Sequence, residues 1–196
     1  MPRFSQVTGI ILAGGLGRRL GGTNKAFLDL NGVSFIERLI ELFDSLFGQS
    51  MIVANNPAAF ADLPIRVVQD LEPYKGTIMG LITGLDYAAT DWSFVTACDT
   101  PLLQEEVVSR VVEATGPEVK VVLSQTPDGL QPLVSAYHRG CLPALTKLYK
   151  QGERSLRPLF KMVPVTCLEV ADMLEADPEL LSFININTPQ DLNRLK

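Results

Sequence analysis

The sequence predicts an α/β fold with a mainly parallel central sheet and helices on both faces. Short apolar runs rich in β-branched residues alternate along the chain with longer segments whose apolar residues recur at helical spacing. Strands separated by helices are typical of parallel sheets, because a parallel pair needs a long crossover connection. No linker of biased composition divides the 196 residues, so we expect a single domain over 1–196.

Each expected strand is a short apolar run bounded by polar or turn-forming residues. The predicted strands cover residues 7–13, 50–55, 65–70, 93–98, 119–124, 132–138 and 182–187. Segment 132–138 follows 119–124 without an intervening helix. We therefore expect one antiparallel or crossover strand in a sheet that is otherwise parallel.

Each expected helix carries an apolar stripe, and several have recognisable end signals. The predicted helices cover residues 34–47, 77–89, 105–115, 141–152 and 188–196, with a short helical turn at 155–163. Ser34 is a favourable N-cap, Gly152 closes the fourth helix, and Thr188 with Pro189 begins the last one.

Composition excludes several classes of function. A net charge of -5 argues against a broad grip on nucleic acid, which needs a basic face. Apolar stretches stay far below the ~18 residues of a membrane span, and the N-terminus has no apolar signal core. The three cysteines are far apart and form no CxxC pair, so we expect no zinc site or disulfide framework and a reducing, cytoplasmic location.

The most informative stretch is "AGGLGRRLGGTNK" (13–25), directly after the first strand. Glycines let backbone N–H groups face an anion, and Arg18, Arg19 and Lys25 add positive charge, so the loop suits a polyphosphate. A purely structural turn needs fewer glycines. A Walker A motif is absent, because Lys25 precedes alanine. A dinucleotide fingerprint fits poorly, since Leu20 replaces its third glycine.

Polar residues follow three of the predicted strands. Asp99 follows 93–98, Asn55 ends 50–55 and Asp70 ends 65–70. The carboxyl ends of parallel strands meet at one edge of a sheet, where α/β proteins bind ligands. Asp99 is therefore a candidate Mg²⁺ ligand. For all three residues the alternative is a role as turn or cap former.

The glycine-rich loop resembles that of the nucleotidyltransferases that activate small molecules, above all the molybdenum cofactor guanylyltransferase family. Four later segments resemble blocks of the same family in the same order, namely "ACDTPLL" (97–103), "QPLVSAY" (131–137), "GERSLRPLF" (152–160) and "FININTPQDL" (183–192). One block alone is weak evidence. Five in order, over nearly the whole chain, make a specific resemblance.

The resemblance implies a three-layer Rossmann-like nucleotidyltransferase fold and a Mg²⁺-dependent reaction. In this family the phosphate of molybdopterin attacks the α-phosphorus of GTP, which gives the guanine dinucleotide cofactor and pyrophosphate. The alternative is a cytidylyltransferase or another small-molecule nucleotidyltransferase of the same fold. A non-catalytic nucleotide sensor is disfavoured because Asp99 and Lys25 are both present. Cofactor-insertion proteins or recipient molybdoenzymes are the partners that the family implies.

The resemblance also assigns roles to individual residues. It implies that Arg19, Lys25 and Asp99 are catalytic and that Asp99 binds the metal. The nucleotide would contact Leu12, Ala13, Gly14, Gly15, Lys25, Asn55, Asp70 and Asp99. The acceptor side would use Ser155, Asn185 and Asn187, with Arg157, Gln131 and Pro132 near the same pocket. A carboxylate such as Asp70 could accept hydrogen bonds from guanine, but whether Asp70 or Asn55 touches the base stays open.

Two segments depart from the family pattern. Asn24 stands where the family has aspartate before the loop lysine, which removes one negative charge. The family's GPLAG block is "KGTIMG" (75–80) here, with Gly76 and Gly80 retained. Since that block normally lies near the base and ribose, base preference is the part of the resemblance that these residues support least.

Overall fold

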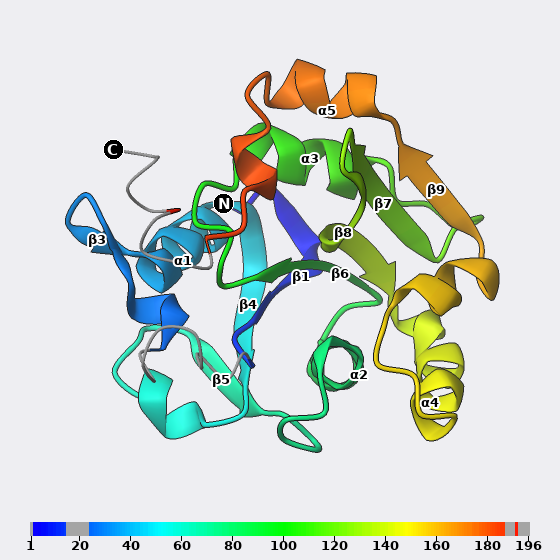
Figure 1. The fold of residues 1–196 in the computed structure, drawn as a ribbon, viewed down its shortest axis with the longest axis horizontal. Helices are drawn as coiled ribbons and strands as arrows, with labels where there is room; N and C mark the ends of the chain where they lie inside the picture. Colours follow the sequence, from blue (N-terminus) through cyan, green and yellow to red (C-terminus); the bar gives the residue numbers. More distant parts are fainter. Residues whose placement is uncertain (1, 15–23, 187–190, 192–196) are drawn as a thin grey trace.

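A seven-stranded sheet forms the centre of the computed structural model, which describes residues 2–14, 24–186 and 191 (Figure 1). Within this part of the chain the strand order is β5-β4-β1-β6-β8-β7-β9. The strands are β1 (Phe4–Leu12), β4 (Phe47–Ala54), β5 (Arg66–Gln69), β6 (Trp92–Ala97), β7 (Val121–Thr126), β8 (Gly129–His138) and β9 (Val165–Leu168). A separate hairpin pairs β2 (Asp29–Leu30) with β3 (Val33–Ser34).

The sheet is mainly parallel, as predicted. Strands β5, β4, β1 and β6 run in one direction, and β9 is parallel to β7. Within the described part of this seven-stranded sheet, only β8 runs against the other strands, antiparallel to its neighbours β6 and β7. This is the segment whose position after β7 predicted an irregular direction.

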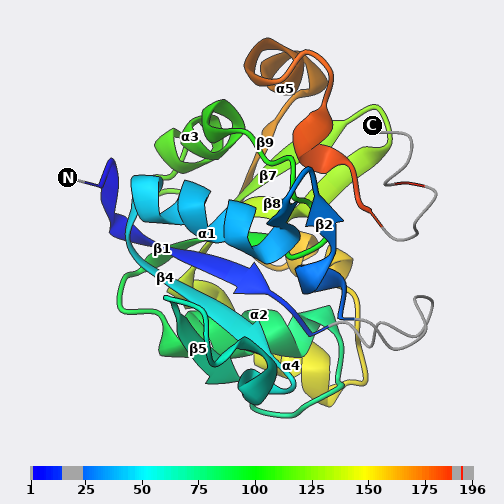
Figure 2. The ribbon, with the colours of Figure 1, turned by 90° about the vertical axis from the view of Figure 1, so that its left-hand side faces the viewer.

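Helices cover both faces of the sheet, so the molecule has three layers (Figure 2). The α-helices are α1 (Phe35–Leu46), α2 (Thr77–Tyr87), α3 (Glu105–Glu113), α4 (Leu142–Lys150) and α5 (Val170–Ala176). Short 3-10 turns cover Lys25–Phe27, Pro57–Phe60, Arg139–Cys141, Arg157–Lys161 and Leu181–Phe183. One apolar core joins α1, α3 and α5 to the sheet, and a second core joins α2 and α4 to its other face.

Helix α1 forms where the sequence predicts it, and its first turn shows why. The Ser34 hydroxyl accepts a hydrogen bond from the backbone N–H of Glu37 at 3.3 Å, and the Glu37 carboxylate accepts from the N–H of Ser34 at 3.0 Å. This capping box satisfies two N–H groups that have no partner inside the helix. The apolar stripe of α1 then packs on β1.

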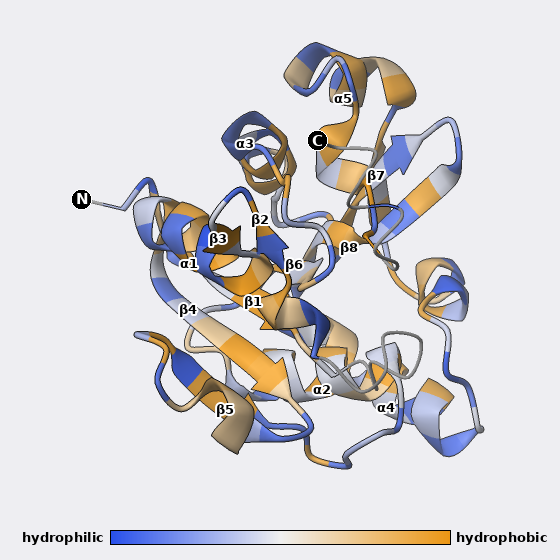
Figure 3. Cartoon of the chain, turned by 60° about the vertical axis from the view of Figure 1, so that its left-hand side comes forward, coloured by the Kyte–Doolittle hydropathy of each residue, from blue (hydrophilic) through white to orange (hydrophobic). Residues whose placement is uncertain are grey.

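Strand β1 lies inside the sheet, between β4 and β6, and its residues from Val7 to Leu12 are buried. Figure 3 shows β1 and the carboxyl half of β4 as hydrophobic ribbons beneath α1. A Cβ atom at Gly9 would lie 2.5 Å from a ring carbon of Phe43 and 2.7 Å from one of Phe47. Glycine is therefore needed here, because the aromatic rings touch the backbone of β1 directly.

The last part of the chain differs from the prediction. The strand expected over 182–187 is wrong, because Leu181–Phe183 is a 3-10 turn and 184–186 has no regular structure. The alternating "FINI" pattern mimics a strand, but Ile186 is buried beside Leu30 and Phe35, and its N–H donates to the carbonyl of Asp99 at 2.9 Å. Strand β9, helix α5 and the β2–β3 hairpin are elements that the sequence did not reveal. The predicted helix over 188–196 lies, except for Asp191, outside the described residues.

The connections place a ligand site at one end of β1. The chain moves from β1 to β4 and β5 on one side, then returns to β6 on the other side. This reversal opens a crevice at the carboxyl ends of β1, β4 and β6. None of the described helices is long and apolar enough to cross a membrane.

Candidate active site

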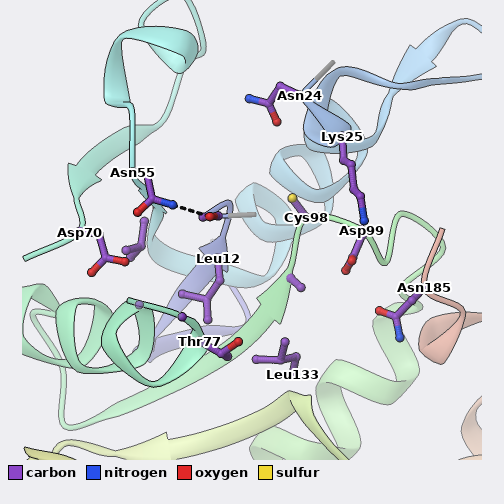
Figure 4. Close-up of a pocket in the computed structure, with 15 residues that line it drawn as sticks. Leu12, Asn24, Lys25, Asn55, Asp70, Thr77, Cys98, Asp99, Leu133 and Asn185 are labelled. Carbon is purple, nitrogen blue, oxygen red and sulfur yellow. Dashed lines mark hydrogen bonds between the residues drawn. The ribbon is translucent and has the colours of Figure 1, made fainter. Parts of the chain in front are cut away.

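A cavity of about 270 Å³ lies at the carboxyl ends of the parallel strands (Figure 4). Loops after β1, β4, β5 and β6 contribute to its wall, together with the first turn of α2. The lining residues include Leu12, Gly14, Lys25, Asn55, Asp70, Asp99 and Asn185, seven of the residues selected from the sequence.

Four of the predicted site residues are described separately, one because it faces the core and three because they lie outside the described residues. Ala13 is buried in the core beneath α1 and does not line the cavity; its N–H donates to the carbonyl of Val53 at 2.8 Å. The alternation of side chains along β1 explains this, because Leu12 and Ala13 must face opposite sides of the sheet. Gly15 and Arg19 lie outside the described residues, as does Asn187.

Asp99 occupies the floor of the cavity, just beyond the end of β6. Its Oδ1 atom is buried and accepts no hydrogen bond from the residues that the structure describes. Burial raises the pKa of the Asp99 carboxyl, while the positive charge of Lys25 opposes the rise. A carboxylate oxygen in this state is energetically costly unless a ligand compensates it.

Lys25 enters the same cavity from the other side, and Figure 4 shows its side chain directed toward Asp99. It begins the 3-10 turn Lys25–Phe27, whose N-cap is Asn24. The Asn24 side-chain oxygen accepts a hydrogen bond from the N–H of Ala26 at 3.2 Å. An aspartate oxygen can make the same bond, so asparagine preserves the turn that carries Lys25.

Asn55 joins two loops around the cavity. Its Nδ2 donates to the carbonyl of Gly14, at the start of the glycine-rich loop, and its Oδ1 accepts from the N–H of Tyr74 at 2.6 Å. Tyr74 has φ of +66°, an uncommon value for a bulky residue, and the bond from Asn55 helps to hold it. Asn55 therefore has a structural task, with one N–H and one oxygen lone pair left for a ligand.

Asp70 is buried beside the first turns of α2. Its Oδ1 accepts a hydrogen bond from the hydroxyl of Thr83 at 2.7 Å. Burial raises the pKa of the Asp70 carboxyl, and the bond from Thr83 opposes that rise. The second oxygen lies 3.9 Å from the position that a Cβ of Gly80 would occupy, so the absence of a side chain at Gly80 keeps this part of the cavity open.

The described residues fit a magnesium site in which the protein supplies only one or two ligands. They contain no group of three or more His, Cys, Asp or Glu side chains that could hold a metal ion. Mg²⁺ is commonly held by one or two carboxylates together with phosphate oxygens of the substrate. The uncompensated, buried Oδ1 of Asp99 meets that requirement. The neighbouring thiol does not compete, because burial raises the pKa of Cys98 to about 12.

The comparisons with known proteins agree with this geometry. Residues 9–167 match the MobA-like NTP transferase domain. This chain belongs to that family. Relatives include a molybdenum cofactor guanylyltransferase from Desulfosudis oleivorans, 34% identical over 96% of this chain and 93% of that protein. A probable molybdenum cofactor guanylyltransferase from Methanosarcina mazei is 33% identical over 95% of this chain and 88% of that protein.

Solved structures show the same fold. Molybdopterin-guanine dinucleotide biosynthesis protein A from Archaeoglobus fulgidus superposes with a TM-score of 0.82 at 27% identity, over 96% of both chains. A 2-C-methyl-D-erythritol 4-phosphate cytidylyltransferase from Thermus thermophilus superposes with a TM-score of 0.69 at 19% identity, over 96% of both chains. The second likeness concerns the fold alone and shows that the predicted three-layer nucleotidyltransferase fold is correct.

A second cavity, of about 290 Å³, adjoins the first in this MobA-like transferase. The two cavities share Thr77, Leu133 and Asn185 as lining residues. The second one is also lined by the predicted acceptor residue Ser155 and by Gln131, Pro132, Arg154 and Arg157. Its mixed wall contains two guanidinium groups, which suit a ligand that carries phosphate.

Sequence reasoning missed the residues at the boundary between the cavities. Thr77 is the first residue of α2, and Leu133 lies on β8, so nothing in their local sequence links them. One signal was available for Thr77. In this MobA-like chain it replaces the proline of the family's GPLAG block, at a helix position that favours proline, and it adds a hydroxyl to the boundary.

Proposed function

We propose that this protein transfers GMP from GTP to the terminal phosphate of molybdopterin, with Mg²⁺, and releases pyrophosphate. The product would be the guanine dinucleotide form of the cofactor, which cofactor-insertion proteins or recipient molybdoenzymes would receive. Family membership and the names of full-length relatives support this proposal. The observation that carries it is the pair of adjoining cavities, one with Asp99 and Lys25 and the other with two arginines.

The arrangement supports transfer without a covalent enzyme intermediate. Transfer of a nucleotidyl group depends mainly on positioning and on stabilisation of charge. In this proposal GTP occupies the first cavity with its phosphates near Lys25, and the molybdopterin phosphate approaches from the second cavity past Thr77 and Asn185. Asp99 would hold Mg²⁺, which when bound neutralises phosphate charge. Lys25 would stabilise the charge that develops on the departing pyrophosphate.

We propose that Asp70 selects guanine over other bases by accepting hydrogen bonds from it. A carboxylate can accept hydrogen bonds from N1–H and the 2-amino group of guanine, whereas adenine offers no such pair of donors. The Oδ2 atom of Asp70 faces the open space beside Gly80, since Thr83 is bound to Oδ1. Asn55, whose amide already joins two loops, would then support the site rather than select the base.

The decisive experiment compares nucleotides under one set of conditions. Purified protein is incubated with molybdopterin, Mg²⁺ and either GTP, CTP or ATP, and both pyrophosphate and the dinucleotide product are measured. We expect product from GTP and far less from the other two. Product from CTP but not from GTP would refute guanylyl transfer and favour the cytidylyltransferase alternative.

Asn55→Asp is expected to raise the KM for GTP by about tenfold with a smaller change in kcat. The substitution replaces the Nδ2 donor with a carboxylate oxygen that faces the carbonyl oxygen of Gly14, so a hydrogen bond becomes a repulsive contact. Steady-state rates over a range of GTP concentrations would measure the effect. Asn56→Asp is the matched control, because Asn56 is exposed and its side chain forms no capping bond. Equal effects of the two variants would show that added charge, rather than the lost bond, is responsible.

A further inference from the structure

Tyr149 contacts Glu72, in the loop that carries Asp70 of the first cavity, and Arg154, which lines the second cavity. It lies on α4, half-buried against the apolar core beneath α2 and α4. Its hydroxyl donates to Oε2 of Glu72 at 2.9 Å. The guanidinium carbon of Arg154 lies 4.9 Å from the centre of its ring. One side chain thus holds an anion with its hydroxyl and a cation with its ring.

Glu72 connects this contact to the nucleotide side. It follows Asp70 by two residues, in the loop between β5 and α2. Two hydrogen bonds hold the same loop. The N–H of Leu71 donates to the Thr83 hydroxyl at 3.1 Å, and the N–H of Tyr74 donates to Oδ1 of Asn55. The bond from Tyr149 links the loop to α4 as well.

Arg154 connects the contact to the acceptor side. It lines the second cavity, and its Cδ lies 4.0 Å from where a Cβ of Gly76 would stand, so its stem lies beside a residue that lines the first cavity. Its Nη1 donates to the carbonyl of Glu153 at 2.8 Å. Within the described part of the chain Arg154 forms no ion pair, which leaves most of its donors for a ligand.

We propose that Tyr149 is a positioning residue that keeps the carboxylate of Glu72 away from Arg154, so that Arg154 can bind the phosphate of the acceptor. Glu72 and Arg154 both contact the same tyrosine, and a carboxylate that is not held elsewhere pairs strongly with a guanidinium group. The hydroxyl therefore prevents Glu72 from forming an ion pair with Arg154, so that Arg154 stays available for the acceptor's phosphate. This inference rests on the proposed function, because it takes the second cavity as the acceptor site.

Tyr149→Phe tests the inference, since it removes only the hydroxyl and leaves the ring beneath Arg154. We expect the KM for molybdopterin to rise about fivefold, as for a partly exposed ionic contact, while kcat and the KM for GTP stay within about twofold. The double variant Tyr149→Phe, Glu72→Gln is expected to return the KM for molybdopterin to within about twofold of the wild type. A neutral amide at position 72 cannot neutralise Arg154, whereas a merely structural role of the hydroxyl would not be rescued by this change.

The matched control is Tyr87→Phe, because Tyr87 is the last residue of α2 and also contacts an arginine. The guanidinium carbon of Arg66 lies 5.7 Å from the centre of the Tyr87 ring. We expect no change in any kinetic constant for this variant. An unchanged KM for molybdopterin in Tyr149→Phe, or a raised KM that the added Glu72→Gln does not lower, would overturn the inference. A wild-type protein that makes no guanine dinucleotide would instead refute the proposed function, so the two failures are distinguishable.

Discussion

Replacing Asp99 with asparagine is expected to lower kcat/KM for guanylyl transfer by roughly 10³-fold while leaving the fold intact or more stable. Loss of activity follows because asparagine has no negative charge with which to hold Mg²⁺. The effect on stability follows from the burial of Asp99, whose Oδ1 has no hydrogen-bond partner among the described residues. Removing a buried charge that Lys25 compensates only in part should raise the free energy of unfolding by up to about 1 kcal/mol.

The pH dependence of this stability difference has a definite sign. Burial raises the pKa of Asp99 above its ordinary value of 3.8. A carboxyl whose pKa is higher in the folded state stabilises the fold fully below 3.8, and that contribution is lost as pH rises through the folded-state pKa. The free energy of unfolding of Asp99→Asn should therefore exceed that of the wild type by an amount that grows from pH 3.8 to the folded-state pKa of Asp99. Above that pKa the difference should be constant.

Urea unfolding of both proteins between pH ~4 and pH ~8, with a metal chelator present, would measure this difference. Asp70 also has a raised pKa, but it is present in both proteins and cancels in the comparison. Added Mg²⁺ and GTP should stabilise the wild type more than the variant. Full transfer activity in Asp99→Asn would show that another group holds the metal.

The parts of this molecule that the sequence predicts are those with local causes. Helix α1 follows from an N-cap serine and an apolar stripe over residues 34–47, and the structure adds a capping box at the same end. The convergence of Asp99, Asn55 and Asp70 follows from one rule, that polar residues just after parallel strands meet at one sheet edge. Neither inference requires knowledge of a distant contact.

The parts that were missed depend on distant contacts or on weak local signals. Strand β9 has only four residues, all half-buried, at the edge of the sheet, so its apolar pattern is indistinct. The segment around Asn185 alternates like a strand, yet its conformation is decided by burial of Ile186 and by the bond to Asp99. The contact between Tyr149 and Glu72 joins residues 77 positions apart, which no periodicity reveals.

Replacing Lys25 with methionine is the second change expected to have a large effect, a loss of roughly 10²-fold to 10³-fold in kcat for guanylyl transfer. Methionine keeps much of the length and apolar volume of the side chain, so the turn capped by Asn24 should persist. The lost charge matters most when negative charge moves onto pyrophosphate, which places the effect in kcat more than in the KM for GTP.

Single-turnover rates with GTP and molybdopterin would separate the chemical step from product release in Lys25→Met. Lys147→Met is the matched control, because Lys147 is exposed on α4 and lines neither cavity. It makes the same change in net charge and should be without effect. Lys25→Arg should recover part of the rate, since it restores the charge but with a different shape. If Lys25→Met raised only the KM for GTP, Lys25 would bind the substrate and its transition state equally well, and stabilisation of the leaving group would have to come from elsewhere in the site.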